Sequence, residues 1–189
     1  MSELRPLDLS HIFASYPELA TERLRLRATT LADAEAVFEY ASDAIATEFV
    51  GFPRHQSIQE SIDFIERNKT FFEGRESIGF AIALKETDEL IGTCSYHHIA
   101  PEHHRLEIGY ILRPKFWGFG YMQEAVREMI RYAFEEMGMH RVEAWCNLEN
   151  ERSSRVMEKC GMKYEGTLCD QQIRFGKYIT QKVYAIIRD

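Results

Sequence analysis

The sequence lacks the features of a membrane protein, a disulfide-rich protein or a nucleic-acid binder. No apolar stretch approaches the roughly 20 residues that a membrane-spanning helix needs. The start of the chain, MSELRPLDLSHIF, has no basic segment followed by an apolar one, so we expect a cytoplasmic protein without a secretion signal. The formal net charge of −7 argues against a nucleic-acid partner and would favour a cationic substrate.

Cysteine is scarce and forms no C-x-x-C pair. This scatter is typical of reduced thiols, and no His/Asp pattern beside any cysteine indicates a covalent catalytic role. We expect all four to pack in the core: Cys94, Cys146, Cys160 and Cys169.

At 189 residues the chain fits one domain, and its periodicity predicts a mixed α/β (α+β) fold. Residues 1–20 contain two prolines and no clear period, so we expect an N-terminal arm that packs on a single domain at 21–189. Alternating or short apolar runs predict about seven strands, at 22–28, 78–84, 90–98, 105–112, 140–146, 162–168 and 178–187. Helical spacing predicts helices at 31–43, 57–72, 121–137 and 150–160. Ser57 and Glu60 have the spacing of a capping box.

The stretch 105–125, RLEIGYILRPKFWGFGYMQEA, joins a predicted strand to a predicted helix through a glycine turn. Pro114 ends the strand because it lacks a backbone donor. Gly118 and Gly120 let the backbone approach a ligand, since no Cβ intervenes. The first N–H groups of the helix have no intrahelical partner and lie at the positive end of its dipole, which suits a phosphate. Two glycines so spaced also occur in ordinary turns, so this loop alone leaves both interpretations open.

Two further patterns follow the loop. The order strand, helix, strand over 105–146 predicts a right-handed crossover and a parallel pair. Asn150 then opens the next helix, and asparagine is among the best N-caps, so it has a structural explanation beside any ligand role. Ser153 has the same two explanations. The basic residues of this helix either meet an anionic ligand or carry solvated charge: Arg152, Arg155 and Lys159.

Three blocks in this order resemble the GNAT superfamily of acyl-CoA-dependent N-acetyltransferases. They are EIGYILRPKFWGFGYMQEA at 107–125, HRVEAWCNLEN at 140–150 and NERSSRVMEKCGMKYEG at 150–166. The similarity covers roughly 21–189 and is strongest to the RimJ/RimL-like branch, which acetylates the N-termini of ribosomal proteins. It implies a GNAT fold, with helices on both faces of the sheet. The fourth and fifth predicted strands, 105–112 and 140–146, would splay to hold CoA.

The resemblance also implies an acetyl-CoA site without a metal. Lys115 stands where the family's pyrophosphate loop has Gln or Arg, and it keeps the charge but loses bidentate geometry. The N–H groups of the loop would cradle the pyrophosphate: Trp117, Gly118, Phe119, Gly120, Tyr121 and Met122. The preceding backbone would pair with the pantetheine arm: Tyr110, Ile111 and Leu112. Asn150 and Ser153 match the family's later motif beside the pantetheine. The Ser153 hydroxyl would help protonate the departing thiolate.

An amine attacks a thioester only as the free base, so the site needs a proton acceptor. Glu107 matches the glutamate of the family's EIGY block, which implies a general base. The alternation of the strand alone would make Glu107 a surface residue facing outward. We expect oxyanion donors among the backbone N–H groups near Ile111 and Leu112.

Two histidine doublets and a helix linker surround these residues. Neither doublet forms H-E-x-x-H, and adjacent strand residues point to opposite faces, so we expect no metal. One of these histidines, or Tyr96, could contact the acceptor: His97, His98, His103 and His104. The linker 45–56 is a natural substrate lid. Loop packing explains its Phe49, Phe52 and His55 at least as well.

We expect acetyl transfer from acetyl-CoA directly to a primary amine, with a protein N-terminal α-amine, for example of a ribosomal protein, as the acceptor. The alternatives are a small amine (polyamine, amino acid or aminoglycoside) and a non-catalytic acyl-CoA-binding regulator. Glu107, Asn150 and Ser153 argue against the regulator. A dinucleotide-binding oxidoreductase would need a third glycine and an acidic residue that are missing. Homodimerisation through edge strands stays open, and no membrane partner is expected.

Overall fold

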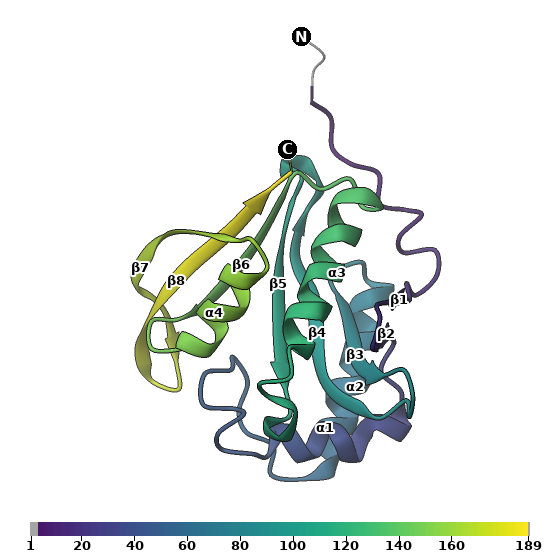
Figure 1. Cartoon of the computed structure of the whole chain (residues 1–189), viewed down its shortest axis with the longest axis vertical. Coiled ribbons are helices and arrows are strands. Elements are labelled where there is room, and N and C mark those ends of the chain that lie inside the picture. Colours follow the sequence, from purple (N-terminus) through teal and green to yellow (C-terminus); the bar gives the residue numbers. More distant parts are fainter. Residues whose placement is uncertain (1–3, 189) are drawn as a thin grey trace.

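Apolar strands build one mixed sheet in the computed structural model, which describes residues 4–188. Its order is β1-β2-β3-β4-β5-β6-β8-β7, and all neighbours are antiparallel except β5 and β6 (Figure 1). The eight strands are β1 (Leu19–Ala20), β2 (Leu24–Arg27), β3 (Ile78–Leu84), β4 (Leu90–Ala100), β5 (Arg105–Leu112), β6 (Arg141–Asn147), β7 (Lys163–Arg174) and β8 (Lys177–Ile187). The predicted mixed fold is confirmed, and the short β1 adds a strand from the N-terminal arm.

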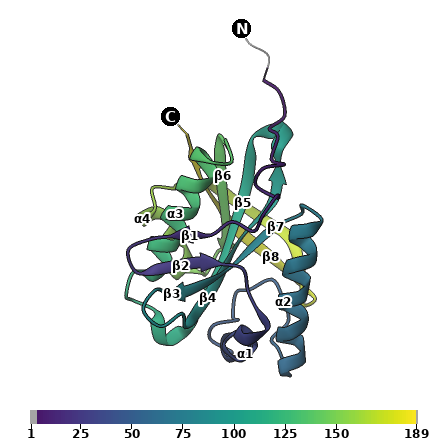
Figure 2. The ribbon, with the colours of Figure 1, turned by 90° about the vertical axis from the view of Figure 1, so that its right-hand side faces the viewer.

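Helices cover both faces of the sheet, as predicted (Figure 2). One face carries α3 (Tyr121–Glu135) and α4 (Glu151–Lys159), and the other carries α1 (Ala34–Ala41) and α2 (Ile58–Glu73). Within residues 4–188 no helix is both long and apolar enough to cross a membrane.

The run IGFAIAL in β3 shows why this strand is apolar throughout. Ile78, Phe80 and Ile82 belong to the core cluster that includes α3, whereas Ala81 belongs to the cluster with α1 and α2. Both faces are therefore buried, which removes the polar alternation that an exposed face would impose. The core also includes Leu9 and Ile12 from the arm.

The parallel contact between β5 and β6 is short. Only three register pairs join the strands, and the last is Glu107 with Glu143. Beyond it β5 stays paired with β4 as far as Leu112, whereas β6 stays paired with β8 as far as Asn147. The two strands therefore diverge, as Figure 1 shows, and the predicted parallel pair and splay are confirmed.

Two local predictions are wrong. Ser57 is the N-cap of α2, but its side chain makes no capping bond, and the Glu60 carboxylate accepts the N–H of Gln56 at 2.7 Å. Neither bond of the predicted capping box is therefore formed. Cys169 is exposed on the edge strand β7, whereas the other three cysteines are buried as expected. No residue of β7 is buried, because this edge strand lies outside both core clusters.

Replacement of Gly92 by alanine should destabilise the fold, because β4 and β5 are closely apposed there. A Cβ at Gly92 would lie 2.3 Å from the Ile111 carbonyl oxygen and 3.0 Å from the Leu112 Cα. We expect the free energy of unfolding to fall by about 1–3 kcal/mol, the usual cost of an overpacked site. Urea unfolding measures it. Gly166→Ala is the control, since a Cβ there meets nothing within 4 Å. Equal stability of the two variants would contradict the prediction.

Candidate active site

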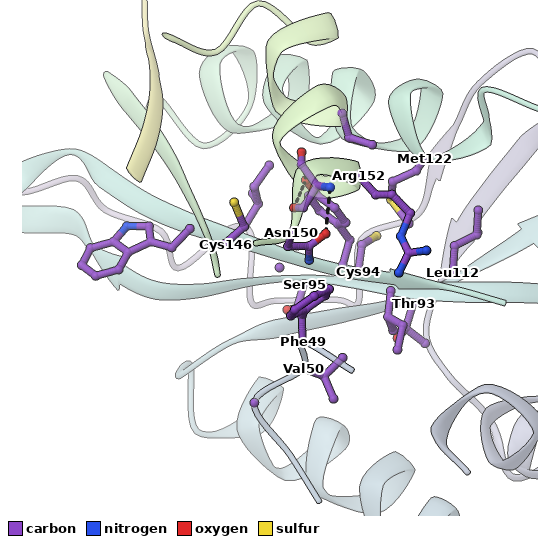
Figure 3. A pocket seen from close by; sticks show the side chains of 18 of the residues that line it. Phe49, Val50, Thr93, Cys94, Ser95, Leu112, Met122, Cys146, Asn150 and Arg152 are labelled. Atoms are coloured by element: carbon purple, nitrogen blue, oxygen red, sulfur yellow. Dashed lines mark hydrogen bonds between the residues drawn. The ribbon is translucent and has the colours of Figure 1, made fainter. Parts of the chain in front are cut away.

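A cavity of about 920 Å³ opens where β5 and β6 diverge. It is lined by the 45–52 linker, by residues of α2, by the strands beside the split, by the first turn of α3, by α4 along its length, and by the β7–β8 hairpin. In Figure 3, Asn150 and Arg152 reach it from one side of the sheet, and Phe49 and Val50 reach it from the other. Its size is that of a pocket for a large organic ligand.

The glycine loop forms one end of the cavity. Gly118 and Gly120 have φ angles of 85° and 82°, in the left-handed region that favours glycine, and Gly120 is the N-cap of α3. No side chain caps this helix, and a Cβ at Gly118 would meet nothing within 4 Å. Tyr121 and Met122 continue the lining into α3. The open backbone at a helix N-terminus fits a diphosphate.

Not every side chain of the predicted CoA-binding set lines the cavity. Lys115 Nζ lies 3.3 Å from Glu89 and 3.7 Å from Glu39, outside the cavity lining, and Phe119 is exposed. Trp117 lines the cavity and donates its indole N–H to the Leu112 carbonyl at 2.8 Å. Tyr110, Ile111 and Leu112 line it as well.

Asn150 and Ser153 take the places that the sequence predicted at the start of α4. The Asn150 side chain accepts the Ser153 N–H at 3.1 Å, so Asn150 is the N-cap. The Ser153 hydroxyl lies 2.9 Å from the Tyr110 hydroxyl, and burial raises the pKa of that phenol. The sequence predicted a role in pantetheine binding for the backbone of Tyr110, but none for its hydroxyl. The alternation of β5 was the available signal, since it places Tyr110 on the face that α4 covers.

Glu107 enters the cavity from the opposite face of β5. Its carboxylate Oε2 lies 2.8 Å from Nδ1 of His98 and 4.0 Å from Nδ1 of His97. His97 pairs directly with Glu107 in the β4–β5 ladder, but the next pair is Ala100 with Arg105, so β4 contains one extra residue. His98 has a φ of 47° at this bulge. The bulge turns His98 toward Glu107, which a regular strand would not do.

The expectation that adjacent histidines point to opposite faces is therefore wrong for this doublet. The ligand atoms of His97, His98 and Glu107 all lie within 4.8 Å of one another, which is close enough to hold a metal ion. The predicted absence of a metal stays a prediction. His103 and His104 lie outside the cavity lining, and the buried Tyr96 hydroxyl donates to a backbone carbonyl of α3.

Comparison with known proteins identifies the family. The family described as "Acetyltransferase (GNAT) domain" matches residues 23–163. The chain belongs to this family. An uncharacterized N-acetyltransferase of Bacillus subtilis (strain 168), YoaA, is 34% identical over 173 residues, which cover 92% of this chain and 98% of YoaA. The ribosomal-protein-serine acetyltransferase of Escherichia coli (strain K12) is 30% identical over 102 residues, 54% of this chain and 57% of that protein.

A solved structure agrees with this identification. The GNAT-family acetyltransferase from Bacillus anthracis superposes with a TM-score of 0.81 at 31% identity, over 90% of this chain and 98% of that one. The protein is thus a GNAT acyl-CoA-dependent N-acetyltransferase, and the predicted family, fold and enzyme class are confirmed.

The predicted lid of this GNAT domain covers the cavity on the Glu107 side. Phe49 and Phe52 line the cavity, whereas His55 is buried outside it, 2.8 Å from the Ser61 hydroxyl. Arg174 of β7 donates from Nη1 to the carbonyls of Phe49 and Val50, at 2.9 and 3.0 Å. The β7–β8 hairpin therefore holds the linker in place.

The pKa of His97 offers a direct test of the arrangement around Glu107. Burial lowers the pKa of His97 below its usual value of 6.5, and the neighbouring carboxylate of Glu107 raises it in part. Glu107→Gln removes that carboxylate, so the pKa of His97 should fall further. Titration of the imidazole signals by NMR measures the shift.

His55 is the internal control for this titration. Burial also lowers the pKa of His55, but the carboxylate that acts on it is Glu60, so the substitution at Glu107 should leave this pKa unchanged. A His97 pKa that rises or stays constant in Glu107→Gln would contradict the geometry described here.

Proposed function

We propose that this GNAT enzyme transfers the acetyl group of acetyl-CoA directly to the α-amine of a protein N-terminus. The observation that carries the proposal is the split between β5 and β6, which opens directly beyond Glu107 and leads from the glycine loop to the lid. The E. coli relative named above, a ribosomal-protein-serine acetyltransferase, supports the acceptor class.

Acetyl-CoA would lie along β5 with its diphosphate on the backbone of the glycine loop. Three cations of α4 line the cavity on this side and complement the phosphates: Arg152, Arg155 and Lys159. Beyond Glu107, β5 has no partner strand on its β6 side, so its free backbone groups can pair with the pantetheine amides. This route delivers the thioester to the narrow end of the split.

The acceptor amine would reach the thioester from the lid side. Its nitrogen attacks the carbonyl carbon, the new C–N bond forms, and the amine proton passes to the Glu107 carboxylate, directly or through one water. An α-amine has a pKa of about 8, against about 10.4 for a lysine side chain, so the free base is easier to obtain at neutral pH. This difference favours a protein N-terminus as the acceptor.

Collapse of the tetrahedral intermediate breaks the C–S bond. Backbone N–H groups near Ile111 and Leu112 would stabilise the oxyanion while it lasts. The thiolate then takes a proton from the Ser153 hydroxyl, which the Tyr110 hydroxyl can replenish across their 2.9 Å contact. Glu107 and Ser153 thus act from opposite faces of the sheet, on opposite sides of the reacting carbon.

Glu107→Gln tests the base. Loss of the proton acceptor should lower kcat/KM for peptide acceptors by about 10²- to 10⁴-fold. The affinity for acetyl-CoA should not change, since Glu107 lies apart from the glycine loop. Thiol release from acetyl-CoA measures turnover against N-terminal peptides, polyamines, free amino acids and aminoglycosides.

Glu102→Gln is the matched control for this variant, because Glu102 lies outside the cavity lining and should tolerate the change. Wild-type kcat/KM across pH in Glu107→Gln would remove Glu107 as the base. Turnover of small amines without turnover of peptides would overturn the protein acceptor.

Gly118→Ala tests the diphosphate site. A Cβ at this position would fill the open space where the phosphate approaches and strain a positive φ, so KM for acetyl-CoA should rise about tenfold or more. Initial rates at varied acetyl-CoA measure it. Gly176→Ala is the control for backbone strain, since Gly176 also has a positive φ (76°) and no atom within 4 Å of a Cβ, but lies outside the cavity lining. Equal KM values in the two variants would contradict the site.

A further inference from the structure

The charge of the cavity is opposite in sign to the charge of the chain. The chain carries a formal net charge of −7, and from this we expected a cationic substrate. Among the described residues that line the cavity, Glu107 is the sole carboxylate, against five lysine or arginine side chains: Arg105, Arg152, Arg155, Lys159 and Arg174. The net charge of the chain therefore does not describe the charge of this site. The excess of cationic side chains in the lining favours ligands that carry anionic groups.

Four of these five cations are accounted for. On α4, Arg152 stacks on Trp117, next to Gly118, and lies 3.5 Å from Glu48. Arg155 and Lys159 line the cavity from the same helix, and the phosphates of CoA would account for them. Arg105 lies 3.5 Å from the carboxylate of Glu143, a buried residue of β6. Arg174 is the cation that neither CoA nor a carboxylate of the chain explains.

Arg174 is half-buried at the end of β7 and faces the lid side of the cavity. It has no carboxylate within 4 Å in the described part of the chain. Its Nη1 is bonded to the two lid carbonyls, whereas Nε and Nη2 make no hydrogen bond to residues 4–188. Burial lowers the pKa of Arg174 because no anion compensates the lost hydration. Carbonyl partners fix the guanidinium in place but leave its charge unpaired.

We propose that the acceptor carries a carboxylate that binds Arg174 while its amine faces Glu107. The chain is then selective for amines with an acidic group a few bonds from the reacting nitrogen. This inference rests on the proposed function, in which the carboxylate belongs to an acidic side chain next to a protein N-terminus. The α-carboxylate of a free amino acid has the same chemistry and is the other source.

The lining around Arg174 suits such a ligand. Phe49 of the lid gives an apolar wall, and Gln172 and Gln181 give neutral amide groups on the hairpin side. A carboxylate can take two parallel bonds from the free Nε and Nη2 of a guanidinium. Glu107, the one carboxylate among the described lining residues, lies 2.8 Å from His98, and Glu48 of the lid lies 3.5 Å from Arg152, so neither is paired with Arg174.

The test compares peptides that differ in one charge. Three peptides of one sequence carry Glu, Gln or Lys directly after the N-terminal residue, and their Kd for the CoA-bound protein is measured by calorimetry, independent of turnover. We expect the Glu peptide to bind about 10- to 100-fold more tightly than the Gln peptide. In Arg174→Gln this preference should vanish, and in Arg174→Glu the Lys peptide should become the preferred one.

Lys177→Gln is the matched control, because Lys177 is an exposed cation on the same hairpin outside the cavity lining, and this variant should keep the wild-type preference. Equal Kd values for the Glu and Gln peptides in the wild type would overturn the proposal. An equal loss for all three peptides in Arg174→Gln would also overturn it, since Arg174 would then only hold the lid.

A second comparison separates this proposal from the proposed function. The free amino acid and its carboxamide are tested beside the peptides, with thiol release as the readout. Turnover of the free amino acid but of neither its amide nor the peptides would support the carboxylate site and overturn the protein acceptor. Equal turnover of all three peptides, whichever residue follows the N-terminal one, would support the protein acceptor and overturn the carboxylate site.

Discussion

The three-pair contact between β5 and β6 is the constraint on which the site depends. Each strand has a full partner on its other side, β4 for β5 and β8 for β6, so the sheet stays intact although the two strands part after Glu107 and Glu143. Where the strands part, backbone N–H and C=O groups of both strands lose their hydrogen-bond partners in the neighbouring strand. Burial of such unpaired groups costs free energy unless a ligand or water forms hydrogen bonds with them. A pantetheine arm has amides at a spacing that can do so.

The split also explains how the groups that we propose to react can come from both faces of the sheet. Tyr110 and Glu107 lie on the same strand but point to opposite faces, toward α4 and toward the lid respectively. If β5 and β6 were paired along their whole length, side chains on opposite faces of the sheet could not contact the same ligand atom. Where the strands diverge, a thioester within the gap is accessible from both sides. The two sides of the cavity, one on each face of the sheet, can then differ in charge and shape independently.

Sequence reasoning predicted most of the residues that line the glycine-loop side of the cavity, because that side is built from local features. The glycine loop, the N-cap Asn150 and the strand carrying Glu107 each have a signature within a few residues. The lid side of the cavity depends on contacts between distant segments. Arg174 reaches the lid across 124 positions of the chain, and no local pattern signals that contact. Lys115 shows the converse, since a motif position predicted a ligand contact and the side chain instead pairs with Glu39 and Glu89.

The bulge in β4 has a consequence for how the chemistry of such a site can vary. One additional residue brings an exposed imidazole against the carboxylate at the narrow end of the split. Deletion of a single residue from this edge would restore regular pairing and turn that ring to the other face without any change at Glu107. Strand length alone would then decide whether this carboxylate has an imidazole as its hydrogen-bond partner.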